Sequence, residues 1–158
     1  MTDLDDFDRR LLRAMQQDNR LTGEALAEAT GLSATACQRR LKRLRAAGVI
    51  EGDVAIVSPK AVGRPLTLIV TLTLERERAD IVDAFKRLVR ETPEIMAGYY
   101  LTGEADFLMI VTARDMEDFE TFSRRVFYGS PHIKGFKTMV VMDRVKASYE
   151  VPVEIGID

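Results

Sequence analysis

The spacing of hydrophobic residues along the chain changes once, near residue 66. Before this point apolar residues recur at helical spacing in three short segments. After it, two helical segments are interleaved with apolar runs that have the length and residue types of strands. The sequence therefore predicts two domains of different class, an all-helical one followed by a mixed one.

Three helices are predicted in the first part, each behind a residue that can cap it. The third is expected to run from Ala34 to Ala47. The expected N-caps are Asp3, Thr22 and Ser33, and Gly31 and Gly48 end the second and third helices. The core-facing residues are Leu4, Phe7, Leu11, Leu12 and Met15, then Ala25, Leu26 and Ala29, then Cys37, Leu41 and Leu44.

A β-hairpin is predicted directly after these helices. The segments 49–51 and 54–57 are apolar and flank Gly52-Asp53, a two-residue turn signal. Two helices at a tight turn followed by a hairpin indicate a winged helix-turn-helix, which we assign to residues 1–58. Residues 59–65 carry turn residues and no clear period, so they are assigned as a linker, and 66–158 form the second domain.

The third helix has a strongly basic face. No acidic residue lies between Glu28 and Glu51, whereas five Lys and Arg residues do. A solvated helix face usually interleaves acids at four-residue spacing, so we favour a helix that enters the major groove of DNA over a merely solvated one. The candidate DNA-binding residues are Ser33, Thr35, Ala36, Gln38, Arg39, Lys42 and Arg43.

The second part predicts the order β-α-β-β-α-β, a ferredoxin-like α+β fold. Its strands are expected at 66–74, 95–101, 105–112 and 136–145, and its helices carry apolar stripes at Ile81, Val82, Phe85, Leu88 and Val89 and at Met116, Phe119, Phe122, Val126 and Phe127. Two strands are apolar on both faces, which indicates that the face without helices is also covered. A homodimer is the favoured explanation, and a monomer with an apolar ligand-binding face is the alternative.

The overall composition narrows the function. With 23 Lys and Arg against 25 Asp and Glu, affinity for nucleic acid must come from a local patch. The single cysteine excludes a disulfide framework, and neither a transmembrane run nor a signal peptide is evident, so we expect a cytoplasmic protein. His132 has no nearby partner for a metal or catalytic site and is expected in a loop. No enzyme activity, metal or cofactor is predicted.

Most of the chain resembles the Lrp/AsnC family of transcription regulators. The segments LDDFDRRLLRAMQQDNRLTGEALAEATGLSATACQRRLKRLRAAGVIEG, TGEADFLMIV and TMVVMDRVK carry the resemblance. It implies an N-terminal DNA-binding domain and a C-terminal domain that binds an effector, usually an amino acid, where neighbouring dimers meet. It also implies dimers that assemble further, often to octamers, on promoter DNA.

The same resemblance suggests which residues bind the effector. Gly103 allows close approach to the backbone, and Glu104 or Asp106 could bind the ammonium of an amino acid. This chain has Gly-Glu-Ala-Asp where family members often have Gly-Asx-Tyr/Phe-Asp, so the pocket shape and ligand are expected to differ. The candidate effector-binding residues are Tyr99, Leu101, Thr102, Gly103, Glu104, Asp106, Met116, Thr138, Met139 and Val140.

Two other functions are compatible with the pattern. One is an architectural DNA-binding protein whose second domain only multimerises. The other is a small enzyme on a ferredoxin-like sheet, such as an acylphosphatase-like hydrolase or a monooxygenase. The second lacks any recognisable catalytic set, so the regulator is the leading hypothesis.

Overall fold

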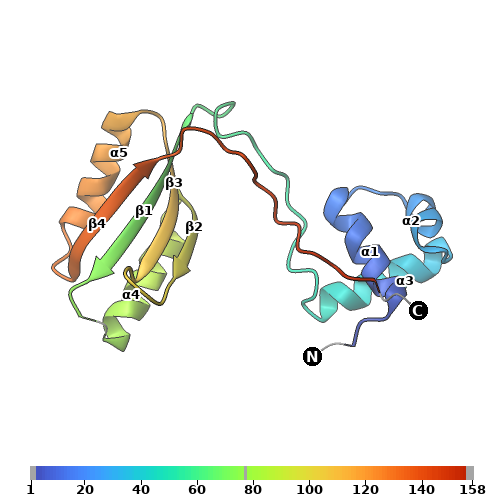
Figure 1. The fold of residues 1–158 in the computed structure, drawn as a ribbon. Helices are drawn as coiled ribbons and strands as arrows, with labels where there is room; N and C mark the ends of the chain where they lie inside the picture. The colour runs from blue at the N-terminus through green and yellow to red at the C-terminus, as the bar shows by residue number, and fades with distance from the viewer. Residues whose placement is uncertain (1–2, 77, 156–158) are drawn as a thin grey trace. The chain divides into compact units, whose positions relative to one another are not determined.

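The computed structural model describes residues 3–76 and 78–155, which form two compact units. Unit 1 contains residues 3–55 together with 146–155, and unit 2 contains residues 56–145 (Figure 1). The segment 146–155, which the sequence places in the second domain, therefore groups with the N-terminal helices. We refer to it below as the tail.

Unit 1 contains three helices, α1 (Asp6–Gln17), α2 (Gly23–Thr30) and α3 (Ala34–Ala46). Their shared core confirms the predicted stripes at Leu11, Leu26, Cys37 and Leu41, which are all buried. Phe7 and Ala29, also predicted to face this core, are instead exposed. Leu44 is also buried, on the same face of α3 as Cys37 and Leu41.

The ends of these helices are set by local hydrogen bonds. Thr22 accepts from the backbone N–H of Ala25, and Ser33 accepts from that of Ala36, as predicted. The N-cap of α1 is Asp5 and not the expected Asp3. Asp5 accepts from the Asp8 N–H, and the Asp8 side chain accepts from the Asp5 N–H. These two reciprocal hydrogen bonds form a capping box, which sets the start of α1 at Asp5.

The predicted hairpin after α3 is wrong. Residues 50–57 form no strand, and Val54, Ile56 and Val57 are 59–70% exposed. An isolated two-stranded hairpin is at best marginally stable, and these apolar side chains have no core in unit 1 to cover them. Ile50 alone packs against the core of the helices.

Unit 2 is a four-stranded antiparallel sheet with two helices on one side (Figure 1). The strand order is β2-β3-β1-β4, which confirms the ferredoxin-like arrangement. The elements are β1 (Leu66–Leu74), α4 (Ala79–Glu91), β2 (Ile95–Tyr100), β3 (Phe107–Ala113), α5 (Met116–Ser123), the π-helical turn η1 (Arg124–Tyr128) and β4 (Ile133–Val140).

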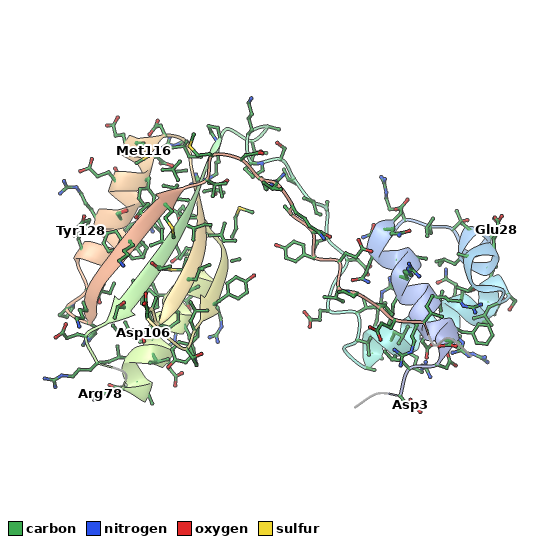
Figure 2. The ribbon with its side chains drawn as sticks, in the orientation of Figure 1. Asp3, Glu28, Arg78, Asp106, Met116 and Tyr128 are labelled. Carbon is green, nitrogen blue, oxygen red and sulfur yellow. The ribbon has the colours of Figure 1, made fainter. Side chains whose placement is uncertain are left out.

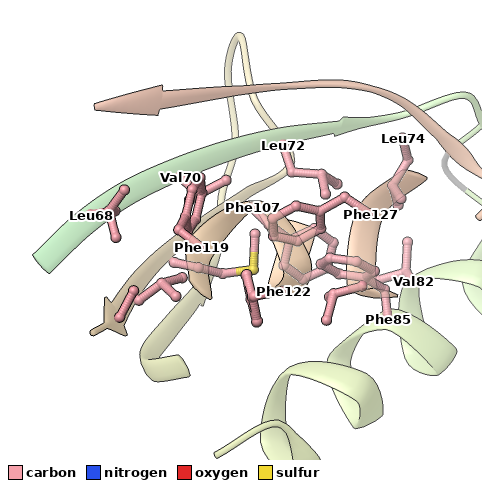
Figure 3. Packing of buried hydrophobic residues seen from close by; sticks show 14 residues of the cluster. Leu68, Val70, Leu72, Leu74, Val82, Phe85, Phe107, Phe119, Phe122 and Phe127 are labelled. Atoms are coloured by element: carbon pink, nitrogen blue, oxygen red, sulfur yellow. The ribbon is translucent and has the colours of Figure 1, made fainter. Parts of the chain in front are cut away.

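The core of unit 2 lies between the sheet and the helices. Alternate residues of β1 are buried, as the two-residue spacing predicts. Phe107 of β3 packs against Phe85 of α4 with ring centroids 4.6 Å apart and ring planes tilted by 57°, and Phe127 meets Phe122 edge-on at 5.3 Å (Figure 3). The strand edge also fits closely at Gly98, where an added Cβ would lie 2.4 Å from a methyl carbon of Val89.

Several elements of unit 2 differ from their predicted limits. Strand β2 ends one residue early, at Tyr100, and β3 spans Phe107–Ala113 in place of 105–112. Strand β4 begins and ends earlier than expected, because Leu74 at the end of β1 pairs with Ile133 across a register shift, and the last bond to β1 runs from the Val141 N–H to the Thr67 carbonyl at 2.9 Å. The second helix ends in a π-helical turn, whose extra residue brings both Val126 and Phe127 into the core. Met116, predicted on the apolar stripe, is instead 53% exposed.

The predicted linker has structure of its own. Residues 59–63 form turns, with Gly63 at a φ of 77°. Arg64 is fixed to unit 2, because its Nε donates to the Thr112 hydroxyl at 3.0 Å and its guanidinium pairs with Asp118. No helix among the described residues is long and apolar enough to cross a membrane.

Candidate nucleic-acid interface and effector region

Helix α3 presents a polar face opposite its buried stripe. At 100° per residue, Thr35, Arg39 and Lys42 lie on the side opposite Cys37, Leu41 and Leu44. All three are exposed, as is Gln38 near them. The predicted DNA-facing side of α3 is therefore accessible in unit 1. Ser33 is occupied as the N-cap, and Ala36 is half-buried.

The other side of α3 is clamped to α1 through a buried carboxylate. Asp8 has only 1% of its side chain exposed, and it pairs with Arg40 at 2.9 Å and with Arg43. Arg40 also pairs with Asp5 at 2.7 Å and lies over the ring of Phe7. Two of the five positive charges of α3 are thus neutralised by acids from α1. The sequence pattern did not reveal this pairing, because the α3 segment contains no acid and its partners lie 32 to 35 residues earlier, at the start of α1.

Hydrogen bonds in this clamp favour the charged forms of Asp5 and Arg40. The backbone N–H of Asp8, and then the Arg40 guanidinium, lower the pKa of the Asp5 carboxyl. Hydrogen bonds to Asp5 and Asp8 raise the pKa of Arg40. The charged pair of Asp5 and Arg40 therefore adds an electrostatic contact to the packing of α3 against α1.

The remaining cations of α3 differ in their pairing. Arg45 donates to Asp53 at 3.0 Å in an exposed pair. Arg39 and Lys42 have no acidic partner among the described residues and are exposed. They are the cations of α3 that are free to contact an external anion without first breaking an ion pair.

The loop that was predicted to hold an effector joins β2 to β3. Gly103 has a φ of 119°, a conformation that only glycine adopts readily. None of the backbone N–H groups of residues 102–105 has a partner in the described structure. Asp106 is buried, and its carboxylate accepts from the Leu74 N–H at 2.6 Å. Glu104 is exposed and is the acid of this loop that remains available.

One chain does not gather all the candidate effector residues into one pocket. Met116 follows the end of β3 at Ala113, whereas the loop precedes Phe107, about 20 Å away along the strand (Figure 2). Tyr99 and Met139 lie on the helix-free face but on opposite edge strands. Thr138 and Val140 pair with Val70 and Leu68, so they face the helix side, away from Met139. His132 is an exposed loop residue, as expected.

Family models match both units. Residues 4–51 match a winged helix-turn-helix DNA-binding domain, and residues 67–151 match the Lrp/AsnC ligand-binding domain. The chain belongs to the Lrp/AsnC family of transcriptional regulators. The match confirms the resemblance read from the sequence, the two-domain fold class, and the presence of a DNA-binding and a ligand-binding domain.

Relatives in this family align over almost the whole chain. An uncharacterized HTH-type transcriptional regulator, y4tD, of Sinorhizobium fredii is 67% identical over 97% of this chain and 90% of its own length. The DNA-binding transcriptional activator DecR of Escherichia coli is 34% identical over 96% of this chain and 99% of its own length.

A solved structure agrees in both units. A transcriptional regulator of Neisseria meningitidis in complex with L-Met superimposes with a TM-score of 0.88 at 30% identity, covering 95% of this chain and 97% of that one.

Sequence reasoning missed the acids that hold α3 in this Lrp/AsnC protein. The sequence pattern assigns no role to Asp5 or Asp8 and assigns Arg43 only to DNA binding, whereas the structure pairs Arg43 with Asp8 and Arg40 with both acids. One signal was available, because Asp8 falls on the side of α1 that carries Leu11, Leu12 and Met15. A carboxylate on a buried stripe requires a charged partner.

Proposed function

We propose that unit 1 reads duplex DNA with the exposed face of α3. The observation that carries this is a pair of cations, Arg39 and Lys42, that have no acidic partner in residues 3–76 and 78–155 and lie beside the hydroxyl of Thr35 and the amide of Gln38. Arginine and lysine bind phosphates, while short polar side chains at the N-terminal end of such a helix meet base edges. The DNA target implies that the protein works in the cytoplasm.

The cations of α3 divide into two groups under this proposal. Arg39 and Lys42 contact phosphates, whereas Arg40 and Arg43 hold α3 on α1 through Asp8. This narrows the set that the sequence suggested, because Arg43 becomes chiefly a structural residue. A contact from Arg43 to phosphate would compete with its existing bond to a buried carboxylate.

The salt dependence of DNA binding tests this division. With a random-sequence duplex, Arg39→Ala and Lys42→Ala should each reduce the slope of log affinity against log salt by about 0.9, because each removes one phosphate contact. Arg45→Ala is the matched control, since Arg45 is already paired with Asp53. Its slope should equal that of the wild type. Unchanged slopes in the Arg39 and Lys42 variants would refute the assignment.

We infer that the ligand of unit 2 is an amino acid. The support is the family model, the L-Met complex of the Neisseria relative and the chemistry of loop 101–106. Its unpaired N–H groups suit a carboxylate, and the exposed Glu104 suits an ammonium. Because Tyr99, Met116 and Met139 are spread over one chain, the pocket is completed by residues of other copies.

A melting-temperature screen across the standard amino acids tests the ligand. A ligand that binds the folded protein raises the melting temperature with concentration. The shift should be lost in Glu104→Gln and retained in Asp106→Asn, whose side chain is already bonded to Leu74. An architectural DNA-binding protein would show no shift with any amino acid.

The helix-free face of the sheet is the proposed dimer interface. Ile69, Leu108 and Ile110 are only half-buried there, and Met139 is 49% exposed. Pairing two such faces around a two-fold axis would present α3 twice to a palindromic site, and further association of dimers would give an octamer. Sedimentation of the wild type and of Ile110→Glu tests this, because a buried charge at the interface should yield monomers. A wild-type monomer would refute it.

A further inference from the structure

The outward face of α1 is used neither by the clamp nor by the DNA-binding side of α3. Arg9, Arg13 and Gln16 recur at helical spacing on this face, turned away from the buried Leu11. No acidic side chain is paired with Arg9 or Arg13 among the described residues. The tail, residues 146–155, lies along this face, and the two line a common groove.

Gln16 holds the tail by its backbone. The side-chain Nε2 donates to the Val151 carbonyl at 3.0 Å, and the Val151 N–H donates to the Gln16 Oε1 at 2.7 Å. Both backbone polar groups of one residue, Val151, are therefore paired with a single side-chain amide, as a neighbouring strand would pair them. Arg9 adds a third contact, from its guanidinium to the Glu154 carbonyl at 3.4 Å.

The side chains of the tail support an extended segment bound on one side. From Pro152 onward, Val153 and Ile155 are half-buried while Pro152 and Glu154 are exposed; the side chain of Val151 is 62% exposed, and that residue is held by its backbone. This two-residue alternation is that of a strand with one covered face. Ile155 lies near the junction of α1 and α2, against Arg10, Ala14 and Ala29.

Charges of both signs line this groove. Arg9 and Arg13 line the groove from α1, with Asp5 and Asp6 at the N-terminal end of the helix, whereas the tail carries Glu150 and Glu154 against the cation Lys146. Opposite charge steers an extended segment onto a surface without fixing its register, and the amide of Gln16 supplies the register.

We propose that the outward face of α1 is a docking site for an extended peptide, and that its occupant is the tail of the same chain. The chain passes between its two units at residues 55–56 and again at 145–146. When the tail is docked, the segment that follows β4 is therefore attached non-covalently to unit 1, the proposed DNA-binding unit. Because a few hydrogen bonds and two half-buried side chains hold it, this attachment is releasable. This device is independent of which ligand or operator the protein binds.

Hydrogen exchange of the full-length protein tests the docking. In the wild type, the peptide containing Val151 should exchange more slowly than a synthetic peptide of residues 146–155. Gln16→Ala should speed its exchange about tenfold, because two hydrogen bonds are lost. Gln17→Ala is the matched control, since Gln17 is exposed on the same helix and bonds to nothing in the tail. Its exchange should match the wild type.

Three results would overturn the proposal. The first is exchange at the rate of the free peptide in the wild type, and the second is equal protection in wild type and Gln16→Ala. The third is protection that falls on dilution, which would show that the tail docks on another copy. Protection that is independent of protein concentration and sensitive to Gln16 alone supports docking within one chain.

Discussion

Each of the two units is stabilised internally by a different kind of interaction. In unit 2 a continuous cluster of aliphatic and phenylalanine side chains fills the space between sheet and helices. In unit 1 the apolar core is small, and a buried carboxylate, Asp8, joins α1 to α3 through two arginines. The helix that we propose for DNA binding thus keeps its position partly through charge. The effector unit keeps its shape through apolar burial.

The largest effect is expected from opening the core of unit 2. Phe107 is 2% exposed and packs on Phe85 and Tyr100. Phe107→Ala should reduce the free energy of unfolding by about 4 kcal/mol, measured by denaturant titration at fixed protein concentration. The same substitution in unit 1, Phe7→Ala, should cost about 1 kcal/mol, since Phe7 is 38% exposed. Equal losses would contradict the contrast between the two cores.

The next effect concerns the clamp in unit 1. Asp8→Asn keeps the shape of the side chain but removes the charge that Arg40 and Arg43 share. We expect a loss of about 2 kcal/mol in unfolding free energy, below the range for fully buried pairs because Arg43 is half-exposed. Asp53→Asn, which breaks only the exposed pair with Arg45, should cost about 0.5 kcal/mol or less. If Asp8→Asn left the free energy of unfolding unchanged, the clamp would not contribute to the stability of unit 1.

Short-range patterns made much of this architecture predictable. Helix stripes and most caps depend on residues within one or two turns, so α2, α3 and the alternation of β1 could be read directly. The prediction of a β-hairpin after α3 was wrong, because an isolated hairpin needs a surface that covers its apolar side chains. A local sequence pattern cannot show whether such a surface exists.

Long-range partners account for what the sequence could not show at the site. Asp8 meets Arg40 and Arg43 across 32 and 35 residues, and Asp106 meets the Leu74 N–H across 32. Each of these acids has a plausible ligand-binding or solvent-facing role when its segment is read alone. Only the fold shows that the carboxylates are already occupied.

A smaller effect distinguishes the two buried acids. Asp106 bonds to a backbone N–H and to no arginine in the described structure, so Asp106→Asn keeps an oxygen acceptor for Leu74. The expected loss is about 1 kcal/mol, half that of Asp8→Asn, because only the charge assistance of one hydrogen bond disappears. Parallel denaturant titrations of the two variants would measure the difference. If Asp106→Asn lost more unfolding free energy than Asp8→Asn, charge would contribute more to the stability of unit 2 than to that of unit 1, contrary to our expectation.

The smallest expected effect is a loss of stability at low pH, to which carboxyl groups of both units contribute. Arg114 and its backbone N–H lower the pKa of Asp118 in unit 2 from 3.8 to about 2, and the clamp lowers the pKa of Asp5 in unit 1. A folded pKa below the unfolded one adds stability that is complete above pH 3.8 and is lost as the pH falls toward about 2. Because Arg114 is 68% exposed, solvent screens this pair and its contribution to stability is small. Carboxyl titration by NMR should show the Asp118 pKa returning toward 3.8 in Arg114→Ala, with Asp5 unchanged as the internal control. If Asp5 also shifted, the two units would be electrostatically coupled, and the separation between a charge-held and an apolar unit would no longer hold.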